Sequence, residues 1–251
     1  MKQKEILVVS SLDGTKQPSL FFESELKGKL PLLVVLHSWS SNRFNKVDVM
    51  VPIAEKSGFH LLLPEFRGEN LERNPHCKEA CGSELAKTDI KDAINYVIEN
   101  EEVDPNNIFL LGGSGGGHMA LLMAGMCPEM FKAIAAVVPI TDLTKWANEN
   151  DKYARHILAC CSNDKEEMLK RSPISYIENI AKANLKIFHG KYDKSVPFRH
   201  SLDLYNEILE KYPNASVYID VFDGGHQFDM PAVEHWFSTQ YRADEKINVT
   251  E

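Results

Sequence analysis

A serine surrounded by glycines lies between two apolar runs near the middle of the chain. The segment LLGGSGGGHMA places Ser114 after residues 108–111, which are apolar, and before a second apolar run. The pattern Gly-x-Ser-x-Gly, from Gly112 to Gly116, is typical of a serine held on a sharp, exposed turn between a strand and a helix. Glycines beside the serine relieve the crowding that side chains would cause at such a turn. Ser114 is therefore a candidate nucleophile.

Two other uses of a glycine-rich stretch fit this segment less well. Phosphate-binding loops follow Gly-x-x-x-x-Gly-Lys-Ser/Thr, or Gly-x-Gly-x-x-Gly with a later acidic residue. No lysine lies near, and the sixth position of the motif that begins at Gly113 is His118. A flexible linker is not expected either, because apolar runs flank the glycines and a helix follows.

A serine hydroxyl becomes an effective nucleophile when a base accepts its proton and an acidic group orients that base. Asp193 follows the apolar run LKIF, and His226 lies in a glycine-rich turn after VYIDVF. The order Ser114, Asp193, His226 is the one expected when a serine follows a strand in this way. Asp142, after the preceding strand, is an alternative acid, whereas Asp223 is expected to shape its own turn.

Attack by Ser114 on a carbonyl carbon would create an oxyanion, which needs two backbone N–H donors. One donor is expected from Gly115, the residue after the nucleophile. The second is expected in the loop after PLLVVLH, where Ser38 and Trp39 are both candidates. Two other histidines have non-catalytic interpretations: His118 is expected to pack against the sheet, and His189 to lie satisfied in the core.

The elements that must position these residues alternate between short apolar strands and amphipathic helices. Continuous apolar runs predict strands that are buried on both faces of a parallel sheet. The Asp13-Gly14 turn instead predicts an antiparallel hairpin at the start of the chain. Strands are expected at 5–10, 19–23, 32–37, 59–63, 108–112, 133–138, 185–189 and 217–222, and helices at 45–57, 84–100, 116–126, 199–211 and 231–241.

The whole pattern predicts one doubly wound α/β domain over residues 1–251, with about eight strands. Residues 141–184 form a longer, mostly helical insertion after a strand. Insertions at the carboxyl ends of parallel strands shape ligand sites, so this segment is expected to be a small cap. Trp146 within it is a candidate wall of the substrate pocket, or an anchor of the cap.

Composition excludes several classes of partner. The 251 residues carry a net charge of −8, which argues against a nucleic-acid or anionic membrane surface. No apolar run approaches the roughly 20 residues that span a bilayer. The N-terminal run resembles a strand rather than a signal peptide, so a cytoplasmic location is expected. The sequence leaves the oligomeric state open.

Five cysteines raise the question of a metal site or disulfides. Their spacing lacks the Cys-x-x-Cys pairs that zinc sites favour, although His76 and His156 lie close to them in sequence. Free thiols in a reducing compartment are the favoured interpretation, with no bound metal. The cysteines are Cys77, Cys81, Cys127, Cys160 and Cys161.

Five motifs together resemble the α/β-hydrolase superfamily, and are most similar to the catalytic domain of the prolyl oligopeptidase (S9) group and its small esterase relatives. They are VVLHSW, LPEFRGEN, GGSGGGHMA, HGKYDKSVP and DGGH, spread over residues 30–240. The resemblance implies that Ser114, Asp193 and His226 are nucleophile, acid and base, and that Gly115 and Trp39 supply the oxyanion donors. It also implies that Arg67 ties loops together behind the site.

The resemblance carries expectations about activity. Family members usually have His-Gly where this chain has His37-Ser38, so the second oxyanion donor is Ser38 or Trp39. A compact hydrolase with a small cap is more often an esterase, so hydrolysis of a small or sugar-linked carboxylic ester is favoured. Cleavage of a short peptide or aminoacyl substrate is the alternative, and a non-catalytic binding module is a remote one. No cofactor is implied.

Overall fold

The strands form a single sheet in which all but the first two neighbouring pairs are parallel. The computed structural model describes residues 1–247. The strand order is β1-β2-β4-β3-β5-β6-β7-β8, and β2 runs antiparallel to both β1 and β4. The strands are β1 (Lys2–Val9), β2 (Lys16–Glu23), β3 (Leu30–Leu36), β4 (His60–Pro64), β5 (Val103–Gly113), β6 (Ala133–Val137), β7 (Leu185–Gly190) and β8 (Val217–Phe222).

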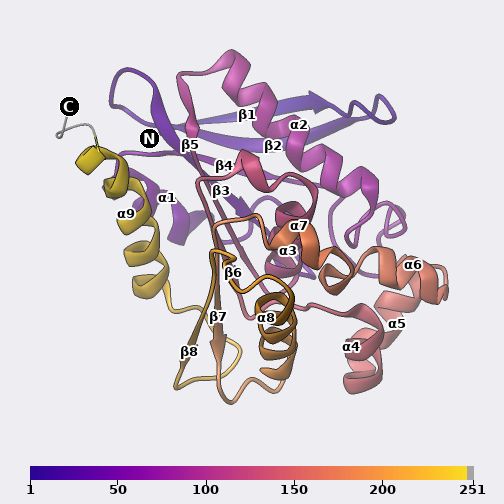
Figure 1. Ribbon diagram of the computed structural model, residues 1–251. Helices are drawn as coiled ribbons and strands as arrows, with labels where there is room; N and C mark the ends of the chain where they lie inside the picture. Colours follow the sequence, from indigo (N-terminus) through magenta and orange to yellow (C-terminus); the bar gives the residue numbers. More distant parts are fainter. Residues whose placement is uncertain (248–251) are drawn as a thin grey trace.

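Helices cover both faces of this sheet (Figure 1). The helices α1 (Val47–Ser57) and α9 (Met230–Ile247) lie against one face, and α2 (Glu84–Asn100), α3 (Gly115–Met126) and α8 (Arg199–Lys211) lie against the other. The remaining short helices belong to residues 141–184. They are α4 (Leu143–Glu149), α5 (Asp151–Cys160), α6 (Lys165–Lys170) and α7 (Ile177–Ile180).

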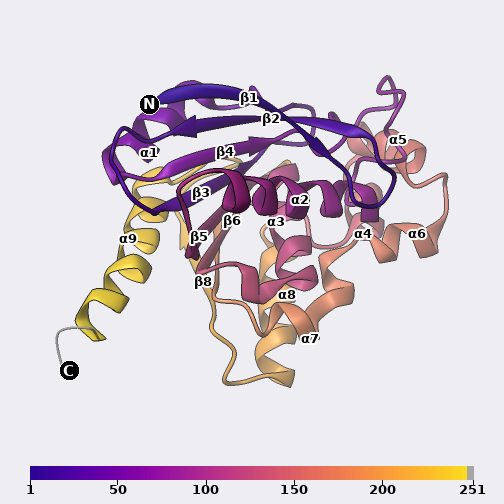
Figure 2. The same ribbon diagram turned by 90° about the horizontal axis from the view of Figure 1, so that it is seen from above.

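The N-terminal hairpin and three helices of the 141–184 segment lie outside the two main helical layers (Figure 2). The β1–β2 hairpin lies at one margin of the molecule, while α4, α5 and α6 lie together beyond the ends of the strands. These three helices thus stand clear of the two main helical layers. The segment 141–184 follows β6, so it leaves the sheet at the edge where Ser114 lies.

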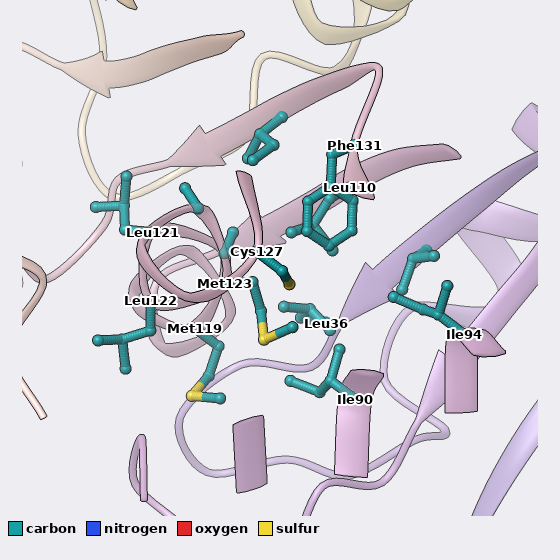
Figure 3. Packing of buried hydrophobic residues seen from close by; sticks show 14 of the residues in the cluster. Leu36, Ile90, Ile94, Leu110, Met119, Leu121, Leu122, Met123, Cys127 and Phe131 are labelled. Atoms are coloured by element: carbon teal, nitrogen blue, oxygen red, sulfur yellow. The ribbon is translucent and has the colours of Figure 1, made fainter. Parts of the chain in front are cut away.

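Capping and packing on the α2–α3 face of the sheet explain why the sequence of α2 is helical. Ser83 begins α2 by accepting a hydrogen bond from the N–H of Ala86, and Ile90 and Ile94 then face the sheet. Figure 3 shows Ile90 beside Leu36 of β3 and Met123 of α3. An apolar stripe at helical spacing is stable here because it removes this surface from water.

Parallel pairing places the ends of the central strands at one edge. In the pairing of β3 with β5, Leu36 lies opposite Gly112, and in that of β5 with β6, Gly113 lies opposite Val137. The residues that follow each of these strands therefore begin at the same edge, which is where open α/β sheets bind ligands. Ser114 directly follows β5 there.

The predicted sheet is confirmed: it is mostly parallel, has eight strands and carries an antiparallel N-terminal hairpin. Boundaries differ where charged residues extend an element. The first strand begins at Lys2 rather than residue 5, because its ladder with β2 pairs Lys2 with Glu23. The last helix continues to Ile247 rather than 241.

Candidate active site

Ser114 occupies a strained turn between β5 and α3. Its backbone has φ 58° and ψ −118°, a conformation that L residues rarely adopt. The flanking glycines are required by close backbone approach. A Cβ at Gly112 would lie 2.0 Å from the Gly116 oxygen, and one at Gly116 would lie 2.3 Å from the Leu36 oxygen. The turn therefore presents the serine hydroxyl above the sheet edge, which costs strain of the order of 1–3 kcal/mol.

Three residues far apart in sequence form a continuous hydrogen-bonded chain at this edge. His226 Nε2 lies 2.9 Å from Ser114 Oγ, and His226 Nδ1 lies 2.7 Å from Asp193 Oδ2. A carboxylate only accepts, so Nδ1–H donates to Asp193 and the Nε2 lone pair is left to accept the serine proton. The arrangement can deprotonate Ser114 as it attacks a carbonyl carbon.

The carboxylate of Asp193 is fully enclosed and held by several donors. Its Oδ1 accepts hydrogen bonds from the N–H groups of Ser195 (2.8 Å) and Val196 (3.0 Å). Burial would raise the pKa of this carboxyl, but hydrogen bonds from His189, His226 and the Val196 N–H outweigh burial and hold the pKa well below its usual range. Asp193 is therefore kept ionised beside the imidazole.

His189 contributes to this environment, which sequence reasoning missed. Its Nε2 lies 2.9 Å from the Val196 carbonyl oxygen and 3.4 Å from Asp193 Oδ2, while Nδ1 lies 2.7 Å from Ser201 Oγ. The carbonyl requires a donor, so Nε2 carries the proton and Nδ1 accepts from Ser201. The side chain is fully buried, yet its N–H faces the acid. His189 and Asp193 are four residues apart, with the turn at Gly190 between them, and this spacing was the signal in the sequence for their contact.

The other acids and histidines have different partners. Asp142 caps α4 by accepting a hydrogen bond from the Lys145 N–H (3.0 Å). Asp223 is exposed in the turn before His226. His118 is buried, its Nε2 lies 2.6 Å from the Arg171 carbonyl oxygen, and burial lowers its pKa to about 4.

The loop after β3 brings one backbone N–H next to Gly115. A Cβ at Gly115 would lie 2.4 Å from the Trp39 nitrogen, so the two backbones are in direct contact. The Ser38 N–H instead donates to Asn45 Oδ1 (3.2 Å). Of the two candidates, Trp39 therefore has the N–H beside Gly115. The Asn70 N–H donates to the Trp39 carbonyl (2.9 Å), which holds the loop in place.

Arg67 lies in the loop after β4 and joins three segments. Its guanidinium contacts Asp13 of the hairpin turn (2.9 Å), Glu79 (2.8 Å) and Asp89 of α2. The Arg67 side chain is 2% exposed. Asp89 is buried too, and removing one partner of a buried ion pair typically costs about 3–5 kcal/mol, which fits a structural role.

Trp146 is buried rather than open to a pocket. Its side chain is 1% exposed, and its Nε1–H donates to the Ser195 carbonyl (2.8 Å). Its ring stacks on Tyr153 (4.5 Å between centroids) and meets Trp39 edge-on (5.0 Å). These contacts favour the anchoring role over the pocket wall, since so little of the ring is accessible.

The described residues bear on metal binding and on membrane insertion. Among the described side chains, those of residues 1–241, no group of three or more His, Cys, Asp or Glu is arranged to hold a metal ion, and all five cysteines are free thiols. No helix within residues 1–247 is long and apolar enough to cross a membrane.

Comparison with known proteins assigns the family. The sequence profile of the prolyl oligopeptidase family matches residues 47–242, which is most of the chain. This chain belongs to that family. Among its curated relatives, the acylamino-acid-releasing enzyme of Mus musculus is 29% identical over 207 residues, covering 76% of this chain.

Two solved structures of low sequence identity share this fold, which confirms the predicted α/β-hydrolase architecture. The acylaminoacyl peptidase of Pyrococcus horikoshii has a TM-score of 0.73 and 20% identity, over 98% of this chain and 41% of its own. An esterase of Pyrococcus furiosus has a TM-score of 0.70 and 20% identity, over 95% of this chain and 88% of its own. The mouse relative is much longer, and this chain spans 28% of it.

Proposed function

We propose that this member of the prolyl oligopeptidase family is a serine hydrolase that cleaves a carboxylic ester through an acyl-enzyme on Ser114. The hydrogen-bonded chain Ser114–His226–Asp193 carries the proposal. His226 accepts the serine proton as Oγ attacks the ester carbonyl, and the imidazolium formed is stabilised by the buried Asp193 carboxylate. The same proton then passes to the leaving alcohol.

The backbone N–H groups of Gly115 and Trp39 are proposed to bind the oxyanion. The two residues are in close backbone contact, where the loop after β3 meets the start of α3. Backbone donors fixed in this way need no reorganisation when charge develops on the carbonyl oxygen, and each contributes about 3–4 kcal/mol in known cases. Water then attacks the acyl-enzyme: His226 accepts a proton from the water and returns it to Ser114 Oγ as the acid is released.

Cleavage of an acylated amino acid from a short peptide is the second candidate. Similarity to the acylamino-acid-releasing enzyme of Mus musculus favours it, whereas the esterase of Pyrococcus furiosus is an example of the same fold in a protein that cleaves esters. A matched pair of substrates separates the two: an N-acetylalanyl p-nitrophenyl ester and the corresponding p-nitroanilide. Hydrolysis of the ester alone supports an esterase, and comparable kcat/KM values for both would replace it with a peptidase.

The nucleophile is tested with a fluorophosphonate probe. Wild-type protein is expected to be labelled on Ser114, and Ser114→Ala to lose both labelling and turnover, the latter by a factor of about 10⁶. Ser238→Ala on α9 is the matched control, because that hydroxyl bonds only the His235 carbonyl of its own helix. Unlabelled wild-type protein with no turnover on any ester or amide would favour a non-catalytic module instead.

A further inference from the structure

Four of the five cysteines lie in one buried cluster beside the candidate site. Cys77 and Cys81 come from the loop between β4 and α2, whereas Cys160 and Cys161 end α5. Cys160 neighbours Cys77 and Cys81 within this cluster, and Cys81 also neighbours Cys161. Cys127 lies elsewhere, in the core drawn in Figure 3. Two segments distant in sequence therefore meet through their thiols.

Within the cluster, one thiol borders the surface and one is central. Cys77 is 9% exposed, whereas Cys81, Cys160 and Cys161 are at most 1% exposed. Cys160 lies in the same buried cluster as Cys77, so Cys77 is the point at which a small molecule would enter the cluster.

A buried guanidinium lies beside the cluster and favours the thiolate form of Cys160. Arg171, at the end of α6, donates from Nη1 to the Ala80 carbonyl (3.0 Å) and from Nη2 to the Lys78 carbonyl (3.0 Å). It thus lies against the turn that carries Cys77 and Cys81. Hydrogen bonds from Cys81 and Cys77, together with the charge of Arg171, lower the pKa of the Cys160 thiol despite its burial. A nearby cation of this kind is typical of reactive cysteines.

We propose that Cys77 and Cys160 form a reversible disulfide when the protein meets hydrogen peroxide. The Cys160 thiolate attacks one peroxide oxygen, the O–O bond breaks, and the displaced hydroxide takes up the proton that Cys160 released. The Cys77 sulfur then attacks the resulting sulfenic acid, the S–O bond breaks, and water leaves with the Cys77 proton. Two thiols lose two electrons, and peroxide is reduced to two molecules of water.

The disulfide would fasten α5 to the loop between β4 and α2. That loop is linked to the candidate oxyanion donor, because the Cys81 N–H donates to Asn70 Oδ1 (2.8 Å) and the Asn70 N–H donates to the Trp39 carbonyl (2.9 Å). The bond closes a long stretch of chain, so it is expected to raise Tm by roughly 5–15 °C. It would also restrain the 141–184 segment beside Ser114.

The test compares reduced and peroxide-treated protein by non-reducing peptide mapping and thermal melting. Wild type and the control Cys127→Ser are expected to gain a Cys77–Cys160 crosslink and a higher Tm, both reversed by dithiothreitol. Cys160→Ser and Cys77→Ser are expected to gain neither. Cys77→Ser lies at the rim of the cluster, so it provides the test if Cys160→Ser fails to fold.

Several results would overturn the proposal. They are a Cys81–Cys161 crosslink instead, oxidation of Cys160 to a sulfinic acid without a crosslink, a crosslink with no rise in Tm, or a stoichiometric zinc ion that protects the thiols. Turnover of the ester should fall by roughly threefold or more on oxidation, a result that rests on the proposed function. The crosslink map and the Tm do not depend on the proposed function. Failure of the disulfide proposal can therefore be distinguished from failure of the proposed function.

Discussion

The ring of Phe228 occupies the place where a side chain at position 113 would begin. A Cβ on Gly113 would lie 1.8 Å from Phe228 Cζ. Gly113 directly precedes Ser114, and Phe228 follows His226 by two residues. The Lys46 ammonium lies 3.0 Å from the centroid of the same ring. Contact between glycine and ring therefore fixes the loop that carries the candidate base against the turn that carries the candidate nucleophile.

This contact predicts that Gly113→Ala displaces His226 from Ser114. The added methyl must push the Phe228 ring away, and the loop that carries His226 moves with it. Displacement of a reacting group by about 1 Å can cost about 10²-fold, so kcat should fall by that order while the protein stays folded. The measurement is steady-state kinetics together with the far-UV circular dichroism spectrum.

The double variant Gly113→Ala/Phe228→Ala separates the clash from other effects. Removing the ring leaves room for the methyl, so the double variant should lose less activity than the two single losses multiplied together. Strictly multiplicative losses would contradict the contact as the cause. The expected positive coupling is a direct test of this packing.

Asp193→Asn should reduce kcat far more than Asp142→Asn. An asparagine beside His226 favours the wrong imidazole tautomer, which costs about 10⁴-fold in the best-studied serine protease case. Asp142→Asn is a matched control, because asparagine also caps helices well and Asp142 caps α4. Equal losses, or a larger loss at Asp142, would transfer the role of the acid to Asp142.

Asp193 should also make stability depend on pH. Its pKa is lowered in the folded protein, because hydrogen bonds from His189 and His226 outweigh the opposing effect of burial. Such a carboxylate contributes stability above its unfolded pKa of about 3.9, and that contribution is lost as pH falls towards the folded pKa. The Tm advantage of wild type over Asp193→Asn should therefore shrink as pH decreases from about 5 to about 3. A constant advantage over this range would refute the assignment.

Trp146→Ala should destabilise the fold rather than alter substrate choice. The ring is 1% exposed and packs on Trp39 and Tyr153, so its removal is expected to cost about 3–5 kcal/mol in urea unfolding. Trp146→Phe keeps an aromatic ring but loses the hydrogen bond to Ser195, and should cost about 1–2 kcal/mol. Unchanged stability of Trp146→Ala with altered preference between large and small esters would restore the pocket-wall role.

The sequence determined the fold class and the residues that could form the site. Continuous apolar runs identified the buried parallel strands, and Asp13-Gly14 marked the hairpin that the structure pairs antiparallel. The glycines around Ser114 predicted the sharp turn, because only glycine fits where one backbone meets another. These are local patterns, which a single sequence records directly.

Only the tertiary structure decided which residues meet. Ser114 and His226 are 112 positions apart, and their 2.9 Å contact depends on strand order and register. His189 looked like a core histidine from its strand alone, yet its N–H faces Asp193. The choice of Trp39 over Ser38 likewise depends on where Asn45 and Gly115 lie. Side-chain patterns specify burial and turns, but contacts between distant segments are fixed only when the whole sheet assembles.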